Sequence, residues 1–149
     1  MAARFWHYAA LAIALAFLLF GLVRLGVGAL LTLQSMGMVE TAWLAEPVAE
    51  VTAFLERKNA VAIFAMSPTA YFLVIMAMGA LLLAGAGRYL LQRGGLGFLA
   101  AYLGIHGLLF VNFLEINPKL WLWGATIAGW LVLWQARRLR RPSAKPAFA

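Results

Sequence analysis

The most informative segment of the chain is residues 96–141, LGFLAAYLGIHGLLFVNFLEINPKLWLWGATIAGWLVLWQARRLRR. Its first part, residues 96–116, is an apolar run that contains only one His, one Asn and one Glu. At about 1.5 Å per residue, a helix of this length measures about 30 Å, the thickness of a bilayer's hydrocarbon core. A short polar corner at 117–119 precedes a second apolar run, 120–136, and four arginines follow within 137–141. The pattern predicts a helical hairpin that crosses a membrane twice.

The composition of the whole chain indicates an integral membrane protein. Of its 149 residues, 65% are hydrophobic and only 11% are charged, which leaves too little polar surface to cover a soluble globule. Two further apolar segments, 5–33 and 68–91, reach the length of a membrane span. The sequence therefore predicts a single membrane domain over 1–149 with four spans and no separate soluble catalytic domain.

The first apolar segment, 5–33, also has features of a secretory signal peptide. Arg4 precedes it, and Val27-Gly28-Ala29 resembles a cleavage site. The apolar run is, however, longer than the about 7–15 residues of a signal peptide's hydrophobic region. An uncleaved first span is therefore the preferred interpretation.

The connection between the first and second spans, 36–66, is too long to be structureless in a compact domain. Glu46-Pro47 suits the first turn of a helix. Apolar and charged side chains then fall on different faces, with Val48, Val51, Phe54 and Leu55 on one and Glu46, Glu50 and Arg57 on another. This pattern predicts an amphipathic helix on the outer membrane surface. Ser67-Pro68 is predicted to cap and begin the second span.

The predicted fold is all-α: an integral membrane four-helix bundle with an amphipathic extracytoplasmic helix between spans one and two. This layout is similar to that of several families of small four-span bacterial membrane proteins, the DoxX-like group among them. No motif in the sequence transfers an activity from such a family.

The net charge of +7 is distributed unevenly along the chain. One set of span ends carries Arg4, Arg88, Arg93, Arg137, Arg138, Arg140, Arg141 and Lys145, whereas the five glutamates, Arg57, Lys58 and Lys119 fall at or near the other. The positive-inside rule then predicts cytoplasmic termini, with the basic tail 137–149 against anionic lipid headgroups. The composition favours a bacterial inner membrane. No nucleic-acid partner is predicted, because the basic residues form no single field.

Arg24 lies within the first predicted span. Counting from Trp6 places it about 27 Å along its helix, near the outer boundary of the hydrocarbon. Glu115 lies about 28 Å from Leu96 and so reaches the same depth on another helix. We therefore predict an Arg24–Glu115 ion pair, with Asn112 one turn from Glu115 as a hydrogen-bonding neighbour. The alternative is that Arg24 extends into the outer headgroups.

His106 lies about 15 Å into its span, near the midplane, with Tyr102 one turn away on the same face. A histidine at that depth is a functional candidate in a membrane. The plainer interpretation is a neutral imidazole hydrogen-bonded to Tyr102 or to a backbone carbonyl. His7 lies at the inner boundary, too far away to join His106 as a second axial ligand of one haem. With no Cys and no Asp in the sequence, we predict no metal site and no cofactor.

Two functions fit these observations. The first is a non-catalytic accessory or assembly subunit that packs against a larger membrane protein or a second copy through small-residue faces. The second is a lipid-, quinone- or other apolar-ligand-binding or transport protein. Its outer-leaflet pocket would use Arg24, Tyr102, His106, Asn112 and Glu115. No catalytic residues are assigned, because no nucleophile is placed beside a base, and an enzyme is not favoured. A polar cavity open to lipid would favour ligand binding, and a dry Arg24–Glu115 contact would favour the accessory role.

Overall fold

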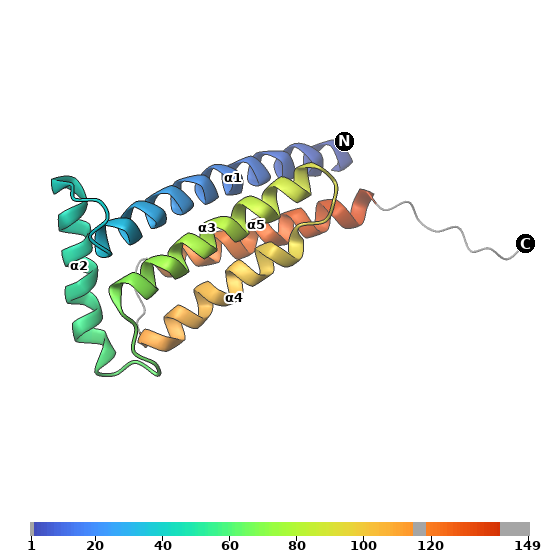
Figure 1. Ribbon diagram of the computed structural model, residues 1–149. Coiled ribbons are helices and arrows are strands. Elements are labelled where there is room, and N and C mark those ends of the chain that lie inside the picture. The colour runs from blue at the N-terminus through green and yellow to red at the C-terminus, as the bar shows by residue number, and fades with distance from the viewer. Residues whose placement is uncertain (1, 115–118, 141–149) are drawn as a thin grey trace, which may run out of the picture.

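The computed structural model describes residues 2–114 and 119–140, and this part of the chain contains helices and no strand. The helices are α1 (Ala2–Ser35), α2 (Ala42–Asn59), α3 (Pro68–Leu90), α4 (Leu96–Phe113) and α5 (Lys119–Arg140). Helices α1, α3, α4 and α5 lie side by side in an elongated bundle, and α2 crosses one end of it (Figure 1). The start of α1 and the end of α5 lie at the opposite end. We call these the α2 end and the termini end.

Among the described residues, three helices are long and apolar enough to cross a membrane. They are Arg4–Ser35 within α1, the whole of α3 and the whole of α4. The protein is therefore a multi-pass membrane protein. Helix α5 has 22 residues, but its tryptophans and its basic last turn make it less apolar than the other three. The predicted fourth span over 120–136 thus stays a prediction.

The start of α3 confirms the predicted capping. The Ser67 hydroxyl accepts a hydrogen bond from the backbone N–H of Ala70 at 3.2 Å, and Pro68 occupies the first turn. Proline is favoured there because its missing N–H would have no partner within the helix. The turn between α3 and α4 uses Gly94 and Gly95, whose φ angles of +100° and +106° favour glycine.

Helix α2 begins at Ala42, four residues before the predicted start at Glu46. The reason is a tertiary contact. Leu44 is buried in a small cluster with Leu31 of α1 and Phe72 of α3, which we call the α2-end core. Burying Leu44 favours helical structure ahead of the proline that the sequence pattern identified as the first turn.

Helices α1 and α3 pack closely along much of their length because glycines face the partner backbone. A Cβ added at Gly28 of α1 would lie 2.8 Å from the backbone nitrogen of Met76. A Cβ added at Gly79 of α3 would lie 2.8 Å from the Cα of Leu25. Such approach through small residues is the usual way in which helices associate in lipid, where the hydrophobic effect does not drive them together.

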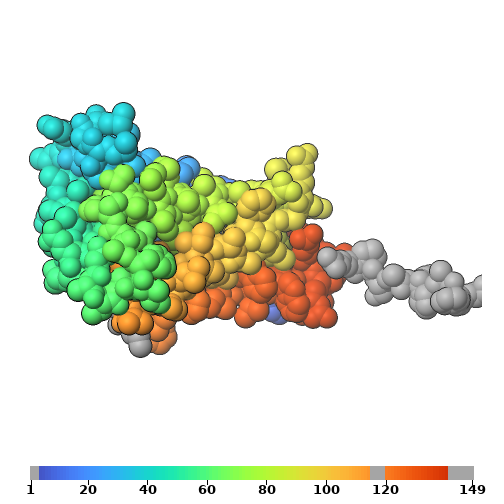
Figure 2. Space-filling model, turned by 60° about the horizontal axis from the view of Figure 1, so that its bottom comes forward, coloured from blue at the N-terminus to red at the C-terminus, as the bar shows by residue number. Residues whose placement is uncertain are grey.

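A larger core lies towards the termini end. It contains Ala10, Ala14, Phe17, Met78, Leu82, Ala86, Tyr89, Leu99, Tyr102, Leu133 and Ala136. The α2-end core lies beneath α2, which covers that end of the molecule in Figure 2. The residues between the two cores are less completely packed, and the cavity described next lies there.

Candidate functional site

A cavity of about 340 Å³ lies between the two cores, in the half of the bundle nearest α2. Every helix contributes to its lining, which consists of Phe20, Val23, Arg24, Val27, Phe54, Tyr71, Ile75, His106, Leu109, Phe110, Phe113 and Leu122. Only three of these side chains, Arg24, Tyr71 and His106, carry polar atoms. A volume of about 300–1,000 Å³ with an apolar lining and a few polar groups is typical of small-molecule sites.

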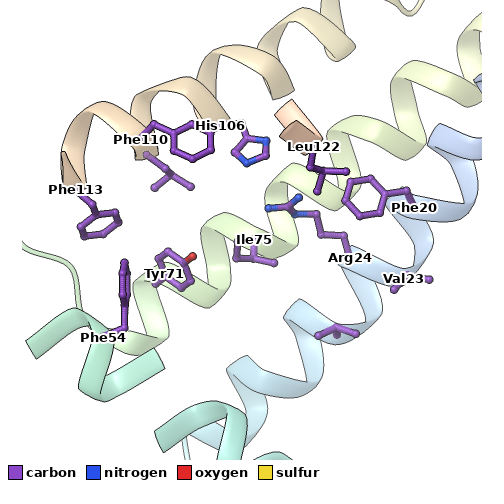
Figure 3. Close-up of a pocket in the computed structure, with 12 residues that line it drawn as sticks. Phe20, Val23, Arg24, Phe54, Tyr71, Ile75, His106, Phe110, Phe113 and Leu122 are labelled. Atoms are coloured by element: carbon purple, nitrogen blue, oxygen red, sulfur yellow. The ribbon is translucent and has the colours of Figure 1, made fainter. Parts of the chain in front are cut away.

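Arg24 supplies the positive charge of this cavity. Figure 3 shows its guanidinium pointing from α1 towards the α4 side, where His106 lies. Nη1 donates a hydrogen bond to the Tyr102 hydroxyl at 3.2 Å, and the guanidinium carbon lies 5.5 Å from the centre of the Phe20 ring. Nε is buried and has no hydrogen-bond partner among the described residues. None of the described glutamates lines the cavity.

Tyr102 links Arg24 to His106. Its side chain is fully buried, and its hydroxyl lies 3.2 Å from Nδ1 of His106 as well as 3.2 Å from Nη1 of Arg24. Arginine only donates, so the Tyr102 oxygen accepts from Arg24, whereas the donor in the bond to His106 depends on the tautomer of the imidazole. The predicted hydrogen bond between His106 and Tyr102 is therefore confirmed.

The His106 ring is also held by stacking. It lies against Phe110, one turn further along α4, with ring centres 5.2 Å apart and an angle of 14° between the planes. Only 4% of the His106 surface is exposed. Its position is thus set by Tyr102 on one side and Phe110 on the other.

Three aromatic rings close the cavity towards α2. Phe54 of α2 lies 5.4 Å from Phe113 of α4 and 6.5 Å from Tyr71 of α3, and Tyr71 lies 6.2 Å from Phe113 (Figure 3). The inclined arrangements of these rings are those that aromatic side chains favour. This aromatic cluster separates the cavity from the α2 end of the molecule.

The cavity reaches the side of the bundle near α1 and α5. Among its lining residues, Val23 is 53% exposed and Val27 is 45% exposed on α1, and Leu122 is 42% exposed on α5. These side chains belong to the lateral surface, which faces lipid in a membrane protein. This side of the cavity is therefore lined by residues that also reach the lateral surface of the bundle.

Arg24 bonds to a residue inside the bundle. Its partner Tyr102 is six residues after the start of α4 and eleven before its end, which is inside the bundle. Helix α1 has 34 residues, or about 51 Å, and so exceeds one hydrocarbon thickness. Because of this excess length, counting from Trp6 does not determine the depth of Arg24.

Asn112 does not line the cavity. Its amide oxygen accepts from the backbone N–H of Phe64 at 2.9 Å, and its amide nitrogen donates to the Phe64 carbonyl at 3.1 Å. The Asn112 carbonyl accepts from Ile63 at 3.2 Å. Asn112 thus holds the connection between α2 and α3. Glu115 lies outside the described residues, so the Arg24–Glu115 pair stays a prediction.

The sequence hypothesis omitted the aromatic lining of the cavity. Helical spacing was the available signal for part of it, because Phe20 precedes Arg24 by four residues and Phe110 follows His106 by four. Nothing in the sequence indicated that Phe54 of α2 and Tyr71 of α3 would meet at the same cavity.

Comparisons of the chain with protein-family models, curated proteins and solved structures found no match. Among the described residues, no group of three or more potential ligand side chains is arranged to hold a metal ion. A function for the chain is therefore inferred from the cavity and from the membrane-spanning helices around it.

Proposed function

We propose that this protein binds an amphipathic small molecule taken from the bilayer, in the cavity beside Arg24. The observation that carries this proposal is a positively charged guanidinium lining a mostly apolar cavity, with its Nε lacking a partner among the described residues. A buried donor without a partner costs about 1–3 kcal/mol, and more when it is charged. A ligand with an acceptor group at Arg24 offsets that cost.

The rest of the lining supports an apolar body for this ligand. Aromatic and aliphatic side chains surround the polar centre, and Val23, Val27 and Leu122 connect it to the lateral surface. A molecule dissolved in lipid can therefore enter without crossing the aqueous phase. The candidate classes are single lipids, quinones and other apolar molecules with one polar head.

The proposal includes an orientation in the membrane. We place α5 as a fourth span, α2 as an amphipathic extracytoplasmic helix, and both termini in the cytoplasm of a bacterial inner membrane. The end of α5 carries Arg137, Arg138 and Arg140 at the termini end, and Arg140 contacts His7 of α1 there. Basic residues at the cytoplasmic ends of spans are the usual arrangement, and they suit anionic headgroups.

A second candidate function is that of an accessory or assembly subunit. Gly97 and Gly104 of α4 and Gly124 of α5 have open space where a Cβ would lie. A helix of another membrane protein, or of a second copy, can approach closely at such positions. This function would not require a ligand in the cavity.

The test fills the cavity without changing the rest of the molecule. Leu109 lines the cavity, whereas its neighbour Leu108 is 62% exposed on the lateral surface of α4. We expect native mass spectrometry of gently extracted protein to show a bound small molecule in the wild type and in Leu108→Trp. The same species should be absent from Leu109→Trp, because the indole occupies its space. Absence of any bound molecule from the wild type and Leu108→Trp, even after incubation with a lipid extract, would contradict ligand binding.

A further inference from the structure

We infer that the ligand is an acidic amphiphile with a single hydrocarbon chain, whose anionic head binds Arg24. This inference rests on the proposed function, because it assigns the chemical class of the ligand in the same cavity. The anionic head is a carboxylate, as in a fatty acid, or a phosphate, as in a single-chain phospholipid.

The charge of the cavity is the first argument. The Arg24 guanidinium is positively charged, and its described partners are the neutral Tyr102 hydroxyl and the faces of Phe20 and Tyr102. A neutral acceptor would satisfy the Nε–H group but leave the positive charge uncompensated in an apolar surrounding. An anion supplies both the acceptor and the opposite charge, and this attraction is strong where the dielectric constant is low.

The shape of the guanidinium is the second argument. Tyr102 takes a hydrogen bond from Nη1, and Nε has no described partner. The edge formed by Nε and Nη2 is the one that the hydrogen bond to Tyr102 does not use. Two parallel N–H groups at that edge match the two oxygens of a carboxylate or a phosphate. Because His106 holds the Tyr102 hydroxyl in turn, Tyr102 and His106 act as positioning residues for the guanidinium.

The third argument concerns the hydrocarbon chain. Ile75 lines the cavity beside Arg24, and Val23, Val27 and Leu122 continue the apolar lining to the lateral surface. A chain attached to a head at Arg24 can leave along these residues into lipid. A cavity of about 340 Å³ is at the small end of ligand sites, which suits one chain rather than two.

The experiment compares heads on chains of equal length. Purified full-length protein, freed of lipid in a non-ionic detergent, is titrated with palmitic acid, hexadecyl phosphate and hexadecan-1-ol, and binding is followed by native mass spectrometry. We expect at least one of the two acids to bind wild-type protein ten times more tightly than the alcohol. The tighter of the two identifies a carboxylate or a phosphate as the preferred head.

The variants test whether Arg24 is responsible. Arg24→Gln should lose the preference for the acid while still binding the alcohol, and Arg24→Lys should keep a reduced preference because it retains the charge. Arg88→Gln is the matched control, since Arg88 is exposed and lies outside the cavity. It should bind all three probes as the wild type does.

The possible failures are distinguishable. Equal binding of acid and alcohol by the wild type, or an acid preference that survives Arg24→Gln, would overturn the inference and leave the proposed function standing. If no probe binds, and an uncharged quinone with a short tail does not bind either, both the inference and the proposed function are wrong. The wild-type comparison does not depend on any variant folding.

Discussion

Tyr102 is the residue that holds the polar centre of the cavity together. Its hydroxyl contacts a nitrogen of Arg24 and a nitrogen of His106, each at 3.2 Å, while its ring lies under the guanidinium. A phenol can do both, because its oxygen accepts from arginine while the same hydroxyl also pairs with the imidazole nitrogen. The arrangement keeps a charged side chain inside the bundle in one orientation.

Removing this hydroxyl should destabilise the protein. Tyr102→Phe deletes one buried and one partly buried hydrogen bond while keeping the ring, and we expect the free energy of unfolding to fall by about 1–3 kcal/mol. Unfolding of the purified protein by a denaturing detergent would measure the change. Tyr8→Phe is the control, because Tyr8 is 66% exposed on α1 and should shift the curve by less than about 0.5 kcal/mol. Equal shifts for the two variants would argue against a structural role for the Tyr102 hydroxyl.

Asn112 supports a different part of the chain. We expect Asn112→Leu, which keeps the approximate size of the side chain, to leave the N–H and carbonyl of Phe64 without these partners. A loss of about 1–3 kcal/mol corresponds to roughly 5- to 150-fold faster amide exchange. Hydrogen exchange of the peptide containing residues 60–66 is the measurement. Exchange in residues 91–95, which Asn112 does not contact, should be unchanged, and an equal increase there would indicate global destabilisation instead.

At the scale of elements, the contact between α1 and α3 depends on glycines that face the partner helix. Gly26 and Gly28 lie two residues apart on α1, but only Gly28 faces a neighbouring helix. A Cβ at Gly28 would meet the backbone of Met76, whereas a Cβ at Gly26 would have nothing within 4 Å. Alanine substitutions at these two positions therefore distinguish the effect of close helix packing on stability from the effect of helix propensity.

We expect Gly28→Ala to destabilise the protein by about 1–3 kcal/mol, because α1 and α3 must move apart to admit the methyl group. Gly26→Ala should be neutral or stabilising by up to about 1 kcal/mol, since alanine favours the helix and meets no neighbour. Thermal unfolding of both variants in the same detergent would measure this. A Gly28→Ala variant as stable as Gly26→Ala would contradict the close approach of α1 and α3.

The sequence predicted correctly those elements that are determined by residues close together in the chain. The spans at α1, α3 and α4 follow from apolar segments of sufficient length, and the start of α3 follows from Ser67-Pro68. The start of α2 was predicted too late, because the contact of Leu44 with Leu31 and Phe72 is not visible in a local pattern.

The candidate site was predicted only in part, for the same reason. Tyr102 and His106 are one turn apart on one helix, so spacing alone predicted their contact. The partner of Arg24 depends on how α1 lies against α4, and the partner of Asn112 is a backbone group in a loop. Neither can be obtained from spacing within a single helix.

At the scale of the whole molecule, the orientation of the protein in the membrane determines which leaflet is nearest the cavity. The cavity lies in the half of the bundle nearest α2, and the aromatic cluster of Phe54, Tyr71 and Phe113 closes it from that end. If α2 is extracytoplasmic, as the distribution of basic residues predicts, the lateral opening faces the outer leaflet. The orientation of the protein therefore determines which leaflet would supply the proposed ligand.

The absence of cysteine from the sequence allows a direct test of this orientation. Glu50→Cys places a thiol on the exposed face of α2, and Leu91→Cys places one at the end of α3 near the termini end. In intact bacterial cells, a thiol reagent that cannot cross the inner membrane should label Glu50→Cys, whereas Leu91→Cys should be labelled only after the membrane is opened. The reverse pattern would place the cavity opening in the cytoplasmic leaflet. Labelling of both variants in intact cells would contradict the assignment of these two ends to opposite sides of the membrane. The predicted pattern would mean that an amphiphile reaches Arg24 from the outer leaflet.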